Sequence, residues 1–510
     1  MFIGIDAGTS GTKTLLCDVG GKILAEATFE YPLYSPRPGW NEQYPGDWWS
    51  AVCKGVRAVL RKAGVKKQDV AGVGLSGQMH GSVFLDRNNR VIRKAILWND
   101  QRTAEQCTEI ESLVGGRKKL ISMVSNPALT GFTAPKILWL RKHEPRHYEK
   151  TKKILLPKDY IRFLMTGEYA SEVSDASGTL LLDVRNRRWH KGVLSRLGID
   201  IELLPRVYES QEVSGVISRQ AASQIGLNAG TPVVGGGGDQ PAGAVGNGIV
   251  KEGLLIATMG TSGVVFAHSK AHRLDPSGRV HTLCSCVAGE YCIFGCMLSA
   301  GGSFQWFQNQ LGKAEIAAAR AKGVDPYELL IKEAAKAPAG CEGLYFLPYL
   351  TGERTPHTDP YARGAWIGLT NRTTRQMMIR ALLEGITYGM ADQIEIMRRM
   401  GIKVSRVRAS GGGALSKWWR KLQADIYNAS IVTINTSAGP AYGAAILAMV
   451  GTGQYKSVGQ ACDAAIRQTN LLKPDGKMVT LYGRRYRLFG ELYRHLKGDF
   501  TEMAGLVQDR

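Results

Sequence analysis

The stretch GIDAGTSGTK at residues 4–13 has a counterpart at residues 257–266, ATMGTSGVVF. Each copy of Gly-Thr-Ser-Gly follows one short apolar run and precedes another, a pattern typical of a tight turn between antiparallel strands. A turn with so little side-chain bulk lets backbone N–H groups point at an anion, and the Thr and Ser hydroxyls add donors. The repeat therefore predicts two hairpins that hold phosphate groups; two ordinary hairpin turns are the alternative.

The similarity between the two halves extends beyond the hairpins. VAGVGLSGQM (70–79) matches VSRVRASGGG (404–413), and DQPAGAVGNGIV (239–250) matches AGPAYGAAILAMV (438–450) as a second small-residue helix. Residues 2–29 have the pattern of a three-stranded meander, and residues 45–64 that of a helix capped by Asp47. Three elements that recur in one order indicate a duplicated βββαβα unit, so we expect two α/β halves with mixed sheets.

The composition narrows the class of protein. The 510 residues carry a formal net charge of +21, but the basic residues are spread along the chain without a recognition helix or a base-stacking motif. No apolar stretch approaches the roughly 18 residues of a membrane span, and the first residues do not resemble a signal peptide. We therefore expect a cytoplasmic protein that binds neither nucleic acid nor membrane. The sequence leaves the oligomeric state open, a homodimer included.

The nine cysteines are scattered, which is typical of reduced thiols. Only Cys284, Cys286, Cys292 and Cys296 cluster, in LCSCVAGEYCIFGC. A structural zinc site usually has paired Cys-x-x-Cys knuckles around a turn, whereas Cys284 and Cys286 alternate within strand-like sequence. We interpret the cluster as buried thiols of a β-hairpin, with a metal site as the alternative.

Two aspartates follow predicted strands and are candidate functional residues. Asp6 lies beside the first Gly-Thr-Ser-Gly turn, where a carboxylate suits Mg²⁺, which prefers oxygen ligands and keeps much of its water. Asp239 follows VVGGGG, whose glycines would let the backbone approach a ligand, and precedes a helix that begins near Pro241. The alternatives are an ordinary turn aspartate for Asp6 and a helix N-cap for Asp239.

Several motifs carry a resemblance to a known family. Two segments are similar to the phosphate loops of the actin/hexokinase-like ATPases and one to their adenosine loop: DAGTSGTK (6–13), MGTSG (259–263) and ASGGGALSKWW (409–419). Two more resemble the signatures of the FGGY carbohydrate kinases: GFTAPKILWLRKHE (131–144) and GAWIGLTNRTTRQMMIRALLEGITYG (364–389). Four resemble xylulokinase members of that family: GLSGQMHG (74–81), ILWNDQR (96–102), GGGGDQPAGAVG (235–246) and LPYLTGERTPH (347–357).

The resemblance implies a fold and a reaction. It implies two RNase H-like α/β domains with a central cleft, residues 1–248 with the sugar site and first phosphate loop and residues 249–510 with the second phosphate loop and adenosine site. It implies that ATP, with Mg²⁺, phosphorylates a pentulose, D-xylulose to D-xylulose 5-phosphate. Members of the family also act on ribulose, xylitol, gluconate and glycerol, so another sugar or polyol is the alternative. A second alternative is a non-catalytic ATP- and sugar-binding protein of the actin-like fold.

The resemblance also assigns roles to residues. It makes Asp239 the base that accepts the proton of the sugar hydroxyl and Asp6 the ligand of Mg²⁺. The implied sugar contacts are Met79, His80, Trp98, Asn99, Asp100, Arg102, Asp239 and Gln240. The implied ATP contacts are Gly8, Thr9, Ser10, Lys13, Gly260, Thr261, Ser262, Gly411, Gly412 and Gly413. Lys13 is equally well read as an ordinary strand lysine. Gln240 departs from the Asn of some xylulokinases, which bears on the sugar and not on the reaction.

Overall fold

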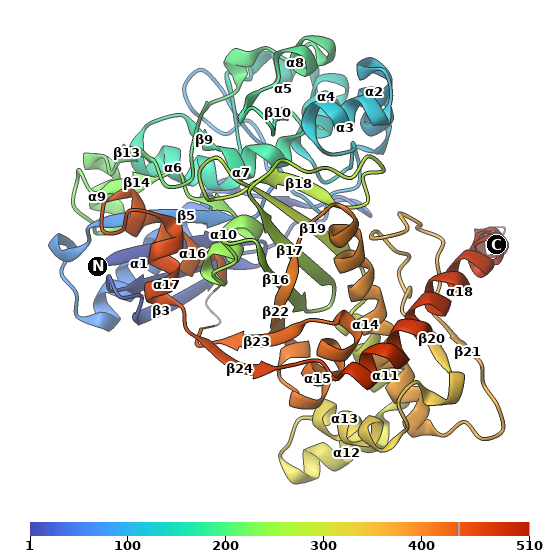
Figure 1. Cartoon of the computed structure of the whole chain (residues 1–510). Helices are drawn as coiled ribbons and strands as arrows, with labels where there is room; N and C mark the ends of the chain where they lie inside the picture. Colours follow the sequence, from blue (N-terminus) through green and yellow to red (C-terminus); the bar gives the residue numbers. More distant parts are fainter. Residues whose placement is uncertain (437–438, 509–510) are drawn as a thin grey trace. The chain divides into compact units, whose positions relative to one another are not determined.

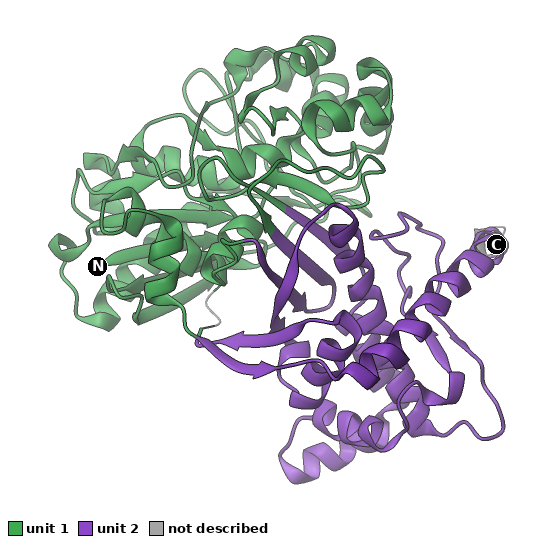
Figure 2. Ribbon diagram, in the orientation of Figure 1, with its two compact units in different colours: residues 1–251, 268–292, 436–467 green, residues 252–267, 293–435, 468–510 purple. Residues whose placement is uncertain are grey.

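The computed structural model of the chain describes residues 1–436 and 439–508 (Figure 1). The chain forms two compact units (Figure 2). Unit 1 comprises Met1–Lys251, His268–Cys292 and Thr436–Arg467, and unit 2 comprises Glu252–Ala267, Ile293–Asn435 and Gln468–Arg510. Each unit therefore combines segments that are far apart in the sequence. The division of the chain into two domains at residue 248 stays a prediction.

Unit 1 is built on a mixed sheet in the order β13-β14-β5-β1-β2-β3, with β15 paired to β5. Its strands are β1 (Phe2–Ala7), β2 (Gly11–Cys17), β3 (Ile23–Glu30), β5 (Gly72–Gly77), β13 (Val213–Val216), β14 (Pro232–Val234) and β15 (Gly237–Gly238). The predicted meander is confirmed, because β1, β2 and β3 pair antiparallel in succession. β5 runs parallel to β1, so the sheet is mixed, as predicted.

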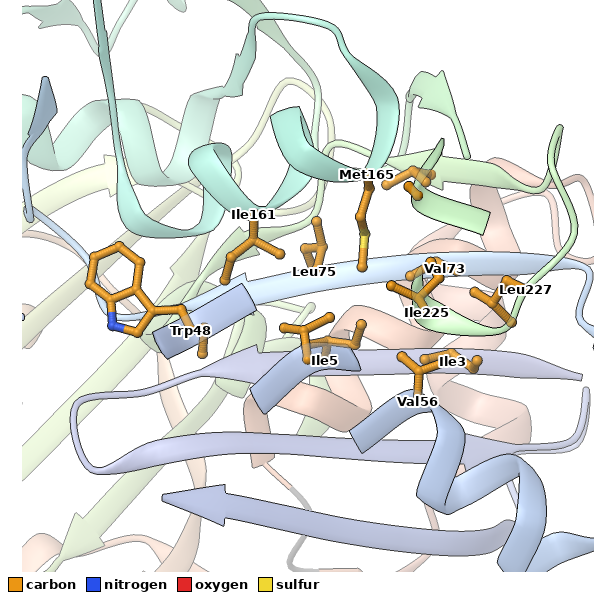
Figure 3. Close-up of a cluster of buried hydrophobic side chains, with 14 of the residues drawn as sticks. Ile3, Ile5, Trp48, Val56, Val73, Leu75, Ile161, Met165, Ile225 and Leu227 are labelled. Carbon is orange, nitrogen blue, oxygen red and sulfur yellow. The ribbon is translucent and has the colours of Figure 1, made fainter. Parts of the chain in front are cut away.

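One face of this sheet is covered by helices α1 (Pro45–Ala63) and α6 (Pro157–Thr166). Figure 3 shows Ile3 and Ile5 of β1 among buried side chains of β5, α1 and α6. The two isoleucines share a face because side chains alternate along a strand. α1 confirms the predicted helix, but Asp47 is not its cap. The cap residue is Tyr44, Pro45 takes the first helical position, and Asp47 lies in the first turn, where an acid still favours the helix dipole.

Helix α16 (Gly439–Gly451) packs against the opposite face of the unit 1 sheet so closely that the two backbones are in contact. A Cβ added to Gly4 would lie 1.8 Å from the carbonyl oxygen of Ala441, and one added to Gly74 would lie 1.9 Å from that of Ala444. α16 also packs on α10 (Asp239–Gly246), because a Cβ on Gly443 would lie 1.8 Å from the Ala242 oxygen. Both predicted small-residue helices therefore exist. Ala438, the predicted start of the second, lies outside the described residues.

The second sheet repeats the arrangement of the first. Its order is β18-β19-β17-β16-β22-β23-β24. The strands are β16 (Gly253–Met259), β17 (Gly263–Ser269), β18 (His281–Cys284), β19 (Tyr291–Met297), β22 (Val404–Gly411), β23 (Ser430–Ile434) and β24 (Gln468–Leu472). β16 pairs antiparallel with β17 and parallel with β22, as β1 does with β2 and β5. The predicted duplication is thus confirmed at the level of topology.

The clustered cysteines fall on and between β18 and β19, as the hairpin interpretation predicts. Cys284, Cys286 and Cys292 are buried and Cys296 is partly buried, and all four are free thiols. Within residues 1–436 and 439–508, no group of three or more His, Cys, Asp or Glu side chains is arranged to hold a metal ion. Burial raises the pKa of the Cys286 thiol to about 12, so the neutral thiol is the stable form.

The remaining elements are mostly helices. In unit 1 they include α2 (Ala104–Val114), α3 (Arg117–Val124), α4 (Thr133–His143), α5 (Pro145–Lys150), α7 (Val173–Ala176), α8 (Lys191–Leu197), α9 (Arg219–Ile225) and α17 (Val458–Ala465). In unit 2 they include α11 (Gly301–Leu311), α12 (Lys313–Lys322), α13 (Pro326–Lys336), α14 (Arg375–Arg399), α15 (Lys417–Tyr427) and α18 (Gly476–Gln508). The basic C-terminal segment forms α18 and buries Tyr482, Phe489 and Tyr493. No described helix is long and apolar enough to cross a membrane.

Candidate active site

The register of three neighbouring strands brings the two candidate aspartates of unit 1 together. Asp6 in β1 lies opposite Ser76 in β5, and Ser76 lies opposite Gly237 in β15. Asp239 follows β15 directly as the first residue of α10. All three strands run parallel, so their carboxyl ends meet at one edge of the sheet, the usual place for a ligand in an α/β protein.

The two carboxylates influence each other electrostatically. Burial, together with the nearby negative charge of Asp6, raises the pKa of Asp239 to about 7, against hydrogen bonds from Gln240. Burial likewise raises the pKa of Asp6 to about 6, while the nearby Ser76 hydroxyl and the charge of Lys13 act to lower it. A carboxyl group with a pKa near neutrality is suited to accept a proton in catalysis.

Asp6 has an oxygen suited to a cation. Its Oδ1 is buried and forms no hydrogen bond within the described residues. A buried carboxylate oxygen without a partner is costly, and a divalent cation would satisfy it. Carboxylate oxygen is also the donor that Mg²⁺ prefers. Asp6 therefore fits the predicted Mg²⁺ role.

The structure corrects one expectation about Asp239 and shows what surrounds the glycines before it. The N-cap of α10 is Gly238 and Asp239 is the first helical residue, so the interpretation of Asp239 as the N-cap is wrong. The glycines before it lie close to protein atoms, and their approach to a ligand stays a prediction. A Cβ on Gly236, whose φ is +76°, would lie 2.0 Å from the Leu75 oxygen, because the strand lies against β5. Residue 238 has no room for a side chain, because a Cβ added there would lie 2.7 Å from Met79 Cγ.

Met79 and His80 follow β5 and lie beside this segment. Met79 is 3% exposed and packs on the residue that precedes Asp239. His80 places Nδ1 2.7 Å from the carbonyl oxygen of Gly178, so Nδ1 donates a hydrogen. In the neutral ring Nε2 is then the acceptor, which suits a sugar hydroxyl. His80 has a φ of +69°, a left-handed conformation that costs a side-chain-bearing residue about 1–3 kcal/mol.

Trp98 and Asn99 lie on a loop that reaches the first phosphate loop (residues 8–11). The indole Nε1 of Trp98 donates to Thr9 Oγ1 at 2.9 Å, while 42% of the side chain stays exposed. Asn99 Oδ1 is buried and forms no hydrogen bond within the described part of the chain. An exposed aromatic face and an unused amide oxygen are the features by which proteins bind sugars. The contact of both residues with the sugar stays a prediction.

Asp100 and Arg102 are occupied by protein partners. Arg102 donates from Nε to Asp100 Oδ1 at 2.9 Å and from Nη2 to Asp100 Oδ2 at 2.7 Å. Asp100 also accepts from the backbone N–H of Asn41 at 2.6 Å, and the Arg102 guanidinium lies 3.6 Å from the centre of the Trp40 ring. Both side chains are at most 1% exposed. This buried pair holds the loop that carries Trp98; its predicted contact with the sugar stays a prediction.

The first phosphate loop connects β1 to β2 as a closed turn, in which Gly8 N–H donates to the Gly11 oxygen at 3.1 Å. Thr9 and Ser10 are the two central residues of this turn. Lys13 follows in β2, directly opposite Asp6. Its ammonium forms a surface ion pair with Glu26 at 2.9 Å, as an ordinary strand lysine would. Its contact with phosphate stays a prediction.

In unit 2, a cavity of about 740 Å³ brings the second phosphate loop and the adenosine loop together. Gly260 and Thr261 line it on one side and Gly412 and Gly413 on another. Aromatic walls come from Phe304, Tyr327, Trp418 and Trp419. A volume of this size suits a nucleoside. Two predicted nucleotide elements more than 140 residues apart therefore share one pocket.

The loops around this cavity are held by backbone contacts. The N–H of Gly301 donates to the Gly260 oxygen at 2.8 Å, and the N–H of Gly302 donates to the Thr261 oxygen at 2.9 Å, so the start of α11 anchors the second phosphate loop. Gly411, with a φ of +72°, lies where a Cβ would be 2.3 Å from the Met259 oxygen. Gly411 thus serves the contact between β22 and β16. Ser262 and Gly411 are not among the residues that line the cavity.

Two groups of residues near the site were missed by sequence reasoning. Lys136 of α4 is fully buried and donates to the carbonyl oxygens of His80, at 2.9 Å, and Gly131. A lysine within the apolar run TAPKILWL is the feature that could have identified it. The second group is a buried charge cluster, in which Lys158 Nζ lies 2.6 Å from Asp159 and 3.6 Å from both Glu172 and Asp175.

The buried charge cluster supports the backbone next to Asp239. Ser174 Oγ donates to Glu172 Oε1 at 3.0 Å and accepts from the N–H of Gly238 at 3.2 Å. The charge of Asp239 contributes to raising the pKa of Asp175, although burial is the larger cause. Sequence reasoning had no way to identify this cluster, because its members are spread over α6, β9 (Ala170–Glu172) and α7.

Comparisons with known proteins agree with this geometry. Residues 1–246 match the N-terminal domain of the FGGY family of carbohydrate kinases, and residues 255–452 match its C-terminal domain. The chain is 37% identical over 495 residues to a xylulose kinase of Bacillus subtilis, covering 97% of both proteins. It is 39% identical over 498 residues to one of Escherichia coli, covering 97% of this chain and 99% of that protein.

The solved structures agree as well. The crystal structure of xylulose kinase from Rhodospirillum rubrum superposes with a TM-score of 0.91 at 28% identity, covering 98% of this chain and 99% of that one. The mixed sheets, their duplicated topology and the match over nearly the whole chain correspond to the α/β fold of the actin/hexokinase-like ATPases. The chain therefore belongs to the FGGY family of carbohydrate kinases.

Proposed function

We propose that this chain phosphorylates D-xylulose with ATP to give D-xylulose 5-phosphate and ADP. The observation that carries the proposal is the meeting of Asp6, Asp239, Met79 and His80 at the carboxyl ends of β1, β5 and β15. A kinase of this kind needs a base for the acceptor hydroxyl, a position for that hydroxyl and a place for the triphosphate. The similarity to xylulose kinases over 97% of the chain supports the choice of sugar.

In the proposed reaction Asp239 accepts the proton of the terminal hydroxyl of the sugar. The hydroxyl oxygen then forms a bond to the γ-phosphorus, and the bond between that phosphorus and the β,γ-bridging oxygen breaks, so ADP leaves with the electron pair. Burial and the charge of Asp6 keep the pKa of Asp239 at about 7, high enough for this proton transfer. His80 Nε2 would orient the sugar through a hydroxyl, and Met79 would pack against its carbon face.

Each unit by itself carries groups suited to part of a nucleotide. Asp6, with its buried Oδ1, would hold Mg²⁺, which supplies positive charge to the phosphates when it is bound. The cavity of unit 2 would take the adenosine against residues 412–413. In this account residues 1–248 supply the sugar site and first phosphate loop, and residues 249–510 supply the second phosphate loop and the adenosine site.

The test is turnover of a panel of acceptors. An assay that couples ADP release to NADH oxidation would compare D-xylulose with D-ribulose, xylitol, gluconate and glycerol at equal concentrations. The proposal predicts the highest kcat/KM for D-xylulose and no turnover without Mg²⁺. A higher kcat/KM for any other acceptor would move the substrate to that compound, and absence of ADP release with every acceptor would refute kinase activity.

A further inference from the structure

A buried pair of glutamines lies beneath the first phosphate loop. Gln43 and Gln78 are each 1% exposed and come from β4 (Glu42–Gln43) and from the segment after β5. Gln43 Nε2 donates to the Thr9 carbonyl oxygen at 2.7 Å. Gln78 Nε2 donates to Gln43 Oε1 at 2.9 Å and to the Gly8 carbonyl oxygen at 3.4 Å. Both loop carbonyls are therefore drawn towards the protein interior.

The orientation of these amides is determined by Trp48. The indole Nε1 of Trp48 can only donate, and it lies 3.0 Å from Gln43 Oε1, so that atom is the oxygen. The amide nitrogen of Gln43 must then face Thr9, and the amide nitrogen of Gln78 must face Gln43. Tyr31 adds a further donor, because its hydroxyl donates to the Gly8 oxygen. The network has one self-consistent arrangement.

The planarity of the peptide bond determines which way the N–H groups of the first phosphate loop point. In a planar trans peptide, the C=O of one residue and the N–H of the next point in opposite directions. The only cis peptide among the described residues is at Pro356. Since the Gly8 and Thr9 carbonyls point towards the glutamines, the N–H groups of Thr9 and Ser10 point away from them. Two successive N–H groups on one side form a concave anion site.

We propose that Gln43 and Gln78, with Tyr31, are positioning residues that aim the Thr9 and Ser10 N–H groups at the phosphates of ATP. The inference rests on the proposed function, because it needs a polyphosphate at this loop. Neither glutamine touches the nucleotide in this account. Gln78 also directly precedes Met79 and His80, so one side chain connects the phosphate loop to the segment that would bind the sugar.

The proposal is tested by binding rather than turnover. Isothermal titration calorimetry of the full chain would measure the dissociation constants of Mg²⁺-ATP and of AMP without sugar. The variant Gln43→Met keeps the length of the side chain and removes its donors to Thr9. Misaligned N–H groups should weaken Mg²⁺-ATP binding by about 10-fold and leave AMP binding within about 2-fold, because AMP lacks the outer phosphates. A merely destabilised fold would weaken both ligands equally.

Two further variants complete the experiment. Gln224→Met is a matched control, because Gln224 Oε1 accepts from the neighbouring indole of Trp49 at 2.8 Å in the same way but does not contact the loop; it should change neither constant. Tyr31→Phe removes one hydroxyl and is the variant to measure if Gln43→Met does not fold. It should weaken Mg²⁺-ATP binding about 3-fold. Unchanged Mg²⁺-ATP affinity in folded Gln43→Met or Tyr31→Phe would overturn the inference. Wild-type protein that binds no ATP would instead refute the proposed function.

Discussion

Replacement of Lys136 by methionine should weaken sugar binding, although Lys136 lies behind the site. Its ammonium donates to the carbonyl oxygen of His80 at 2.9 Å, and Thr133 Oγ1 donates to the same oxygen at 3.0 Å. These bonds hold His80 in its left-handed conformation, with a φ of +69°. The lysine is fully buried, and burial lowers its pKa to about 7. Burial of this ammonium group costs free energy, which indicates that Lys136 has a role beyond packing.

The size of the expected change in sugar KM follows from comparing the free energy of the two hydrogen bonds to the His80 oxygen with the backbone strain of His80. A left-handed residue with a side chain costs about 1–3 kcal/mol. A hydrogen bond from a charged donor contributes about 1.5–3 kcal/mol, and one from a neutral hydroxyl about 0.5–1.5 kcal/mol. Both bonds together exceed the strain, whereas the Thr133 bond alone falls short of it. In Lys136→Met the backbone of His80 should therefore relax, and a loss of about 1.5 kcal/mol corresponds to roughly a 10-fold rise in KM for the sugar.

Steady-state kinetics with each substrate varied in turn would measure this effect. Lys136→Met should raise the KM for D-xylulose about 10-fold and leave the KM for ATP within about 2-fold. Thr133→Val, which removes the weaker bond and keeps the β-branched shape, should raise the sugar KM only about 2- to 3-fold. A folded Lys136→Met variant with an unchanged sugar KM would refute the argument that this lysine positions His80.

Three further predictions concern the site itself. His80→Ala should raise the KM for the sugar roughly 2- to 15-fold without changing that for ATP, and equal effects on both would remove His80 from the sugar site. Asp6→Asn should raise the Mg²⁺ concentration for half-maximal rate without altering sugar affinity measured by tryptophan fluorescence; an unaltered Mg²⁺ requirement would argue against Asp6 as the ligand. Because the pKa of Asp239 is about 7, kcat/KM should fall about 10-fold per pH unit below that value, and a flat profile between pH 5 and 7 would contradict Asp239 as base.

The sequence was sufficient to predict the elements that depend on local pattern. The meander of residues 2–29 and the helix at residues 45–63 follow from apolar periodicity and turn residues, and the structure confirms them. The duplicated topology follows from repeated motifs in one order. Helix caps were predicted less well. Asp47 and Asp239 both carry a favoured capping side chain, yet Pro45 and the extended Gly238 set the helix starts one to three residues earlier.

Packing between residues far apart in the chain could not be predicted from the sequence. The run of glycines at residues 235–238 looks like a place for a ligand, but its absent side chains make room for Leu75, Met79 and other protein atoms. Only the three-dimensional register reveals this, because β15 pairs with a strand some 160 residues earlier. The buried lysine at 136 and the glutamines under the first phosphate loop were missed for the same reason. Their partners are backbone carbonyls, which leave no trace in the side-chain pattern.

The central claim, that Asp239 is the base of a sugar kinase, is tested most directly by Asp239→Asn. The asparagine keeps the shape and removes the proton acceptor, so kcat with D-xylulose should fall about 10²- to 10⁴-fold while the dissociation constant of ATP stays within about 2-fold. Folding raises the pKa of Asp239, so its ionised form destabilises the fold as pH rises from about 4 through 7. The melting temperature of the variant at pH 8 should therefore be no lower than that of the wild type. A folded variant that turns over D-xylulose at nearly the wild-type rate would contradict the account.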